Sequence, residues 1–195
     1  MTRSRHLIPH WTTALLTPLA AALLAPGAVA DSEMDLAVSS KAVTFDYRLR
    51  DTLNNTLWGG GAVYNDDYSA FLLSGLFNVV GNATQLDNLY TGLGVKAVFH
   101  DAFQSGGALG LGGSLQYQPP ETQGFGVEGQ LYYAPSALSF NSDSYLDIYA
   151  RVTYDVHPQA RVFVGYALVN VEYDDDFNSE VEFKDGIDLG FTLTF

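Results

Sequence analysis

Histidine is the side chain that most often serves as a general base near neutral pH, and residues 31–195 contain two, His100 and His157. His157 precedes Pro158 in a predicted turn. Asp101 follows His100, but neighbouring residues on a strand point to opposite faces, so this pair does not form a dyad. Ser–His–Asn chemistry would need His100 as its base, because His157 is predicted at the opposite end of the fold. We therefore expect no enzymatic activity and no cofactor, and a hydrolase that uses His100 is the least favoured alternative.

A second group with possible chemistry is acidic. Asp174, Asp175 and Asp176 precede Asn178 and Glu180, and their oxygens are the hard ligands that Ca²⁺ prefers. The segment lacks the glycine of an EF-hand loop, and runs of like charge are usually solvated. We interpret it as a solvated loop, or as one that meets lipopolysaccharide through bridging divalent cations, and we predict no dedicated metal site there.

The elements that position these residues are strands, because apolar and polar residues alternate along most of the chain. The clearest alternation covers residues 43–50, 89–99, 109–117, 125–133, 145–156 and 186–195, and the weaker segments are 56–64, 70–79 and 160–173. No helical stretch competes with them. Asp35–Ser39 would add a tenth strand and give the even number expected of a barrel with both termini at one end. Ten strands are our prediction, and eight are the alternative.

The breaks between these segments alternate in length. Short breaks lie at Asp51–Asn55, Gln118–Thr122 and His157–Gln159, and longer ones at Asn65–Ser69, His100–Ser105, Ala134–Asp143 and Asp174–Glu180. Short periplasmic turns alternating with longer outer loops are typical of a transmembrane barrel. Gly81–Asn88 is the exception, since it is long where a short turn is expected.

Alternation alone does not say which face is the core. The second face of several segments is small and neutral, as in Gly110, Gly112, Ser114 and Gln116. A soluble barrel would need a charged outer face, whereas small side chains fit the crowded lumen of a narrow barrel. We therefore predict an all-β fold, a closed antiparallel up-and-down transmembrane β-barrel whose apolar face contacts lipid.

The N-terminus resembles an export signal. Arg3 and Arg5 precede an uncharged stretch from Leu7 to Ala30, which ends in Ala28-Val29-Ala30. This pattern predicts a secretory signal peptide over residues 1–30 and a single domain over 31–195, and three prolines in the stretch disfavour an uncleaved anchor. Loss of two arginines changes the formal net charge from −13 to −15. A nucleic-acid partner is therefore not expected, and the lack of cysteine excludes disulfides.

The predicted barrel assigns roles to three sets of residues. Opposite charges facing the lumen favour a structural ion-pair network over a selectivity ring, and they are Asp46, Arg48, Arg50, Lys96, Glu128, Asp147, Arg151, Asp155 and Asp188. Aromatic residues near strand ends predict girdles at the two interfaces, and they are Phe99, Tyr117, Phe125, Tyr133 and Tyr154. The last strand alternates up to its terminal aromatic through Leu189, Phe191, Leu193 and Phe195.

Residues 124–173 resemble the YfaZ family of bacterial outer-membrane proteins. The shared features include Tyr132-Tyr133-Ala134-Pro135, Ser144-Tyr145, Ala150-Arg151 with Tyr154, Gly165-Tyr166 and Asn170. The resemblance implies an outer-membrane barrel in a Gram-negative bacterium, and it implies no assigned activity. The last strand also resembles the general assembly signal that the barrel insertion machinery recognises.

From these features we expect a porin-like but largely filled barrel with a non-enzymatic role in the envelope or at the cell surface. A narrow channel for ions or small solutes is the alternative, since a ten-stranded barrel can enclose a thin pore. The expected partners are outer-membrane lipid and lipopolysaccharide, periplasmic chaperones and the barrel assembly machinery.

Overall fold

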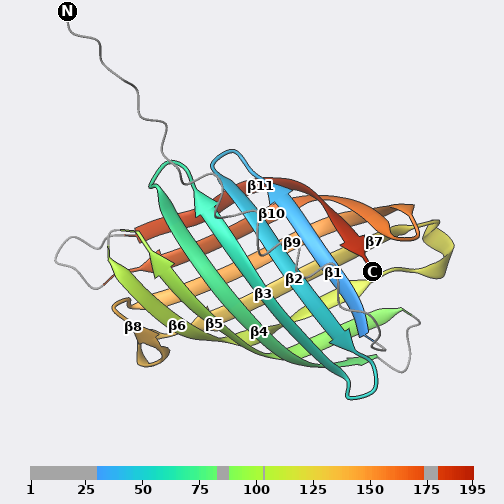
Figure 1. Cartoon of the computed structure of the whole chain (residues 1–195), viewed down its shortest axis with the longest axis horizontal. Helices are drawn as coiled ribbons and strands as arrows, with labels where there is room; N and C mark the ends of the chain where they lie inside the picture. The colour runs from blue at the N-terminus through green and yellow to red at the C-terminus, as the bar shows by residue number, and fades with distance from the viewer. Residues whose placement is uncertain (1–29, 83–87, 103, 174–179) are drawn as a thin grey trace, which may run out of the picture.

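The computed structural model describes residues 30–82, 88–102, 104–173 and 180–195, which form a closed antiparallel barrel of ten long strands (Figure 1). The strands are β1 (Ala30–Val38), β2 (Ala42–Asp51), β3 (Thr56–Asn65), β4 (Ala70–Asn82), β5 (Leu89–Asp101), β6 (Ser105–Tyr117), β7 (Phe125–Ala134), β9 (Ser144–His157), β10 (Ala160–Glu172) and β11 (Glu180–Thr194). Each long strand pairs with its neighbours along the chain, and β11 returns to pair with β1. The predicted fold class and the count of ten strands are confirmed.

The barrel is closed by the first and last strands. Met34 pairs with Leu193 and Val38 with Leu189, and the Phe195 amide donates a 2.8 Å hydrogen bond to the Ser32 carbonyl. Because β1 and β11 satisfy each other's backbone groups, no strand edge stays open.

The predicted bounds of the first strand were wrong. β1 begins at Ala30 and ends at Val38, whereas the sequence pattern suggested Asp35–Ser39. The acidic residues Glu33 and Asp35 hid the strand, because they interrupt the apolar pattern while occupying its inward face.

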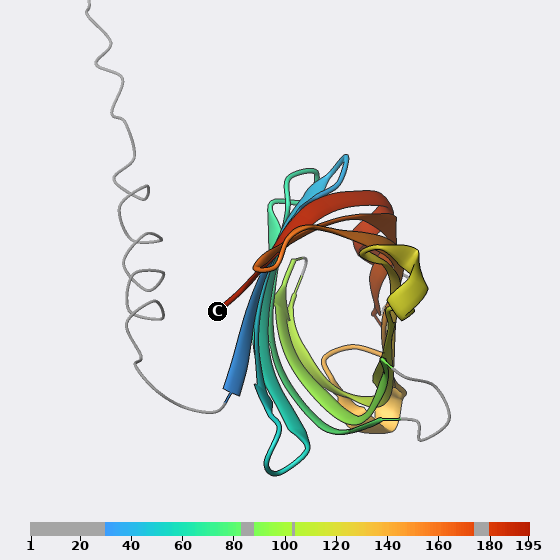
Figure 2. The ribbon, with the colours of Figure 1, turned by 90° about the vertical axis from the view of Figure 1, so that its right-hand side faces the viewer.

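The two ends of the barrel differ. One end holds Ala30, Thr194 and the connections 52–55, 118–124 and 158–159, and we call it the terminus end. Figure 2 looks into this end. The loop end is opposite and holds the connections 39–41, 66–69 and 135–143. Residues 1–29, 83–87, 103 and 174–179 lie outside the described residues, and with them the predicted signal peptide, most of the Gly81–Asn88 break and the Asp174–Asp176 loop.

The longest described connection at the loop end folds back onto the barrel wall. It contains a single 3-10 turn, η3 (Ser136–Leu138), and the two-residue strand β8 (Ser139–Phe140). β8 pairs with Gly107 and Ala108 of β6. β7 ends at Ala134, so β8 covers the part of the β6 edge that β7 does not reach. A second 3-10 turn, η2 (Pro120–Thr122), lies in a connection at the terminus end.

A β-bulge in β11 changes which side chains face inward. Val169 of β10 pairs with Lys184 and Asn170 pairs with Glu182, so Phe183 is the extra residue. As a result Phe183 and Lys184 are both buried inside the barrel although they are adjacent in sequence. Simple alternation would have placed one of them outside.

The described residues contain no helix with the length and hydropathy needed to cross a membrane.

Candidate functional site

The lumen near the terminus end is crossed by a chain of ion pairs that meets at Asp35 of β1. Arg48 of β2 and Arg151 of β9 both donate to Asp35 Oδ2, at 2.8 Å and 2.9 Å. Arg48 also lies 3.3 Å from Glu33. Asp35 is buried, and the two guanidinium groups compensate a carboxylate that would otherwise be costly to remove from water.

The chain continues across the barrel through Glu128 of β7. Arg151 Nε donates to Glu128 Oε2 at 2.7 Å, and Arg161 Nη1 of β10 donates to Glu128 Oε1 at 2.9 Å. Arg161 Nε then donates to Asp155 Oδ1 at 2.7 Å. Five strands are therefore tied together by consecutive carboxylate–guanidinium contacts, which favour fixed, directional geometry.

Aromatic rings hold Arg151 in the middle of this chain. Its guanidinium carbon lies 4.9 Å from the Tyr149 ring centroid and 4.1 Å from that of Phe163. The Phe163 ring lies over Gly190, where a Cβ would come within 2.4 Å of Phe163 Cζ. The glycine in β11 thus makes room for the ring on which Arg151 stacks.

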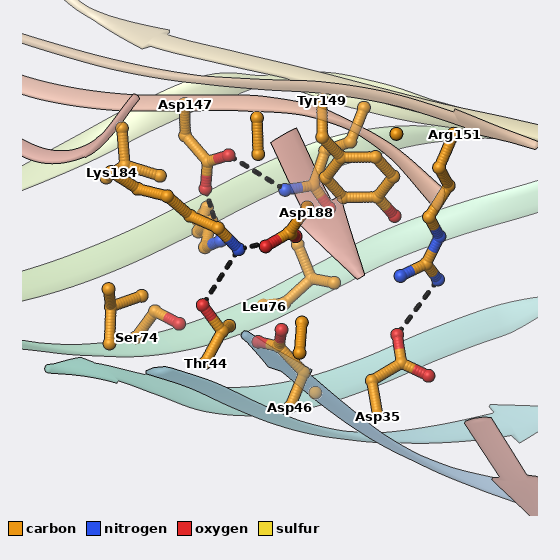
Figure 3. Close-up of a pocket in the computed structure, with 18 of the residues that line it drawn as sticks. Asp35, Thr44, Asp46, Ser74, Leu76, Asp147, Tyr149, Arg151, Lys184 and Asp188 are labelled. Atoms are coloured by element: carbon orange, nitrogen blue, oxygen red, sulfur yellow. Dashed lines mark hydrogen bonds and ion pairs between the residues drawn. The ribbon is translucent and has the colours of Figure 1, made fainter. Parts of the chain in front are cut away.

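A second cluster lies nearer the loop end (Figure 3). Lys184 Nζ donates to Asp188 Oδ2 at 2.7 Å and to Thr44 Oγ1 at 2.8 Å. Lys96 forms an ion pair with Asp147, which also accepts hydrogen bonds from the Tyr145 hydroxyl and the Gln130 amide. A cavity of about 60 Å³ lies between the two clusters. Such a space holds a few water molecules.

The loop end of the lumen is filled by apolar side chains, which we call the plug. Its members are Ala42, Val63, Ala70, Leu72, Val98, Ala108, Ala134, Tyr145, Val169, Val171, Tyr173, Val181 and Phe183. They come from both walls of the barrel and pack as one cluster of buried residues. Because close-packed side chains leave few voids larger than water, the described side chains leave little open space in the lumen at this end.

His100 lies inside the plug and not at a surface. It is 0% exposed, its Nδ1 lies 3.0 Å from the Tyr173 hydroxyl, and its ring contacts Phe183. Burial raises the pKa of Tyr173 to about 12, so this hydroxyl stays protonated at neutral pH. Asp101 is not hydrogen-bonded to His100 but accepts from Ser105 at 2.8 Å. The other histidine, His157, is exposed in the turn before β10.

The nine charged residues that the sequence predicted in the lumen do not all form ion pairs with one another. Seven take part in the ion pairs above, and they are Arg48, Lys96, Glu128, Asp147, Arg151, Asp155 and Asp188. Asp46 lines the central cavity and Arg50 lines the lumen nearer the terminus end, and neither has an ion-pair partner within 4.0 Å among the described residues.

Four further members of the lumen ion pairs were not predicted from the sequence: Glu33, Asp35, Arg161 and Lys184. Glu33 and Asp35 lie on the inward face of β1, and Arg161 lies on the inward face of β10, so alternation extended over the full strands would have found them. Lys184 could not have been found in this way, because the bulge at Phe183 shifts the alternation.

The predicted aromatic and terminal residues lie on the outer face. Phe99, Phe125, Tyr133, Tyr154, Leu189, Phe191 and Phe195 are exposed, and Tyr117 and Leu193 are half-buried. Phe125 and Tyr154 are paired across strands near the terminus end, with ring centroids 4.6 Å apart. Trp58 and Phe77 form a similar pair, at 4.5 Å, that sequence reasoning did not include.

The arrangement of these residues supports charge pairing and binding. Within the described ranges, no group of three or more His, Asp or Glu side chains is arranged to hold a metal ion. The carboxylates of the ion-pair chain already accept from guanidinium groups, and His100 is buried beside the plug.

A family model described as YfaZ precursor matches residues 13–195, nearly the whole chain. Comparison with curated proteins and with solved structures gives no match.

Proposed function

The chain belongs to the YfaZ family, and we propose that it is an outer-membrane β-barrel with a filled, non-conducting lumen and a non-enzymatic role in the envelope or at the cell surface. The observation that carries this proposal is the inverted placement of polarity, with charges inside the barrel and apolar side chains outside. The narrow channel is an alternative that the recordings below address, and a hydrolase that uses His100 is the least favoured one.

The outer face supports the membrane location. Large aliphatic side chains are exposed on the outer face of seven of the ten long strands, β4 to β7 and β9 to β11: Leu73, Leu93, Leu109, Leu111, Leu115, Val127, Leu131, Ile148, Val152, Val162, Val164, Ile187 and Leu189. Soluble proteins rarely expose a continuous apolar surface of this extent, whereas a transmembrane barrel needs one.

The distribution of charge supports the same location. Nine Lys and Arg residues in the chain, less Arg3 and Arg5, leave seven in residues 31–195. Six of them line the cavities of the lumen or form ion pairs inside it: Arg48, Arg50, Lys96, Arg151, Arg161 and Lys184. The seventh, Lys41, pairs with Asp67 at the loop end. A cation on the lipid-facing surface is costly, and none of the seven is placed there.

The filled lumen is tested by planar-bilayer recording of the refolded chain. We expect no discrete conductance steps from the wild type, because the plug blocks the loop end. Replacing Phe183 and Tyr145 together by serine removes two of the largest fully buried side chains of the plug and is expected to produce steps. Phe125→Ser, a matched change on the outer face, should leave the bilayer silent.

Discrete, salt-dependent steps from the wild-type protein would favour the narrow channel instead. Heat-modifiable gel mobility of each variant supplies the folding control, since it distinguishes a closed barrel from an unfolded chain. A protein that is recovered from the periplasm in soluble form would contradict the membrane location.

Export and assembly follow from the same proposal. Residues 1–30 serve as the signal peptide, periplasmic chaperones carry the chain, and the barrel assembly machinery inserts it by recognising Leu189, Phe191, Leu193 and Phe195 in and after β11. At the loop end, Asp66 and Asp67 are exposed acidic residues that can approach lipopolysaccharide through divalent cations.

Phe195→Ala tests the assembly signal. Phe195 and Phe125 are both outward aromatics at the terminus end and are both 53% exposed, so Phe125→Ala is a matched control. We expect Phe195→Ala to lower the amount of assembled barrel in cells several-fold, measured by heat-modifiable mobility of the membrane fraction. Phe125→Ala should have little effect on assembly, and the two purified variants should unfold at similar denaturant concentrations. Equal assembly of both variants would mean that Phe195 acts only by packing.

A further inference from the structure

The lumen is a blind well that opens at the terminus end. A cavity of about 310 Å³ lies in this mouth, and its lining is Arg50, Thr52, Asn55, Val80, Gly81, Asn82 and Tyr90. Arg50, Val80 and Tyr90 also line the next cavity inward, so the mouth adjoins the charged lumen. The plug closes the other end. A solute that enters the mouth must therefore leave by the same route.

Arg50 is the one charged residue in this lining. Of the six lumen cations, the other five form ion pairs with carboxylates within 4.0 Å. Arg50 has no such partner in the part of the chain that the structure describes. Asp31 is its cross-strand neighbour on β1 but does not pair with it. Among the described residues, Arg50 is thus a cation at the mouth of the barrel with no carboxylate within 4.0 Å.

Arg50 is also held in place for binding. Its Nη2 donates to Gln116 Oε1 at 3.0 Å, and its guanidinium carbon lies 4.7 Å from the Tyr90 ring centroid. A guanidinium carries five N–H donors, and a single one is used in this contact. The remaining donors match the two oxygens of a carboxylate or phosphate.

We propose that this mouth is a binding site for a small organic anion, a carboxylate or a phosphate monoester that carries a compact apolar group. Arg50 binds the anionic oxygens. Val80 and the Tyr90 ring contact the apolar group, and Asn55 and Asn82 supply polar contacts at the rim. The cavity volume lies at the lower end of the range for ligand sites, which limits the ligand to a single small ring or a short chain.

The test is isothermal titration calorimetry of the refolded full chain in detergent micelles, with phenyl phosphate and benzoate as probes and benzyl alcohol as the neutral control. We expect the wild type to bind both anions and not the alcohol, and higher ionic strength should weaken binding. Arg50→Gln should weaken binding by about tenfold or more, because it removes charge-assisted hydrogen bonds. Lys41→Gln makes the same charge change at the opposite end of the barrel and should leave binding unchanged.

Tyr90→Leu provides a second variant that keeps Arg50 if Arg50→Gln does not give a heat-modifiable barrel. It should weaken phenyl phosphate binding more than inorganic phosphate binding, since only the former contacts the ring. The proposal is overturned if the wild type binds neither anion, if Arg50→Gln binds as well as the wild type, or if Lys41→Gln weakens binding equally. A folded Tyr90→Leu variant that binds phenyl phosphate normally would overturn the assignment of the ring.

Discussion

Replacing Arg151 by alanine is expected to lower the free energy of unfolding by about 3–5 kcal/mol, the range found when one partner of a buried ion pair is removed. Arg151 links Asp35 to Glu128 in the chain of ion pairs. Its loss leaves the four carboxylates of that network to share two arginines, Arg48 and Arg161. The rings of Tyr149 and Phe163 lose the guanidinium that stacks on them. Denaturant unfolding of the purified barrel in lipid vesicles measures the change.

Two further variants make the Arg151 result specific. Lys41→Ala removes a cation from an exposed pair with Asp67, 3.3 Å apart, and should change the free energy of unfolding by at most about 1 kcal/mol. Adding Asp35→Asn to Arg151→Ala should recover part of the loss, because it removes one of the four carboxylates that then share two arginines. If Arg151→Ala costs no more than Lys41→Ala, the lumen network is hydrated and does not hold the strands together.

The strand pattern and the closed barrel could be predicted because period-2 alternation depends only on the backbone. A strand that carries Asp147, Tyr149 and Arg151 on one face and Ile148 and Val152 on the other must turn one set inward. This rule placed the inward charges of β2, β5, β7 and β9 without any knowledge of their partners.

The pairing of those charges could not be predicted, because it depends on closure. Asp35 meets Arg151 only when β1 and β9, far apart in sequence, face each other across the lumen. The bulge at Phe183 depends on the register of β10 against β11, and alternation cannot reveal it. The plug was missed for a different reason. At the loop end the inward residues are apolar too, as Leu72 and Val98 are, so both faces of the strand resemble a lipid-facing surface.

The proposed membrane location leads to a prediction that a soluble barrel would not share. Leu111, at the centre of β6, and Val156, beside the turn at the terminus end, are both aliphatic and outward-facing, with 54% and 55% of their surface exposed. In water these two sites should tolerate arginine equally. In a bilayer, arginine near the midplane costs about 2–4 kcal/mol, and near the interface about 0–1 kcal/mol.

Leu111→Arg is therefore expected to lower the free energy of unfolding in lipid vesicles by about 2–4 kcal/mol, while Val156→Arg changes it by about 0–1 kcal/mol. Because the two sites are equally exposed, a difference between their changes in unfolding free energy reports their different depths in the bilayer. Unfolding of both variants in vesicles of thinner and thicker lipid gives an internal check, since the interfacial site should become more sensitive as the bilayer thickens. Equal effects at the two sites would mean that the apolar outer face does not contact a hydrocarbon core, because only such a core distinguishes them.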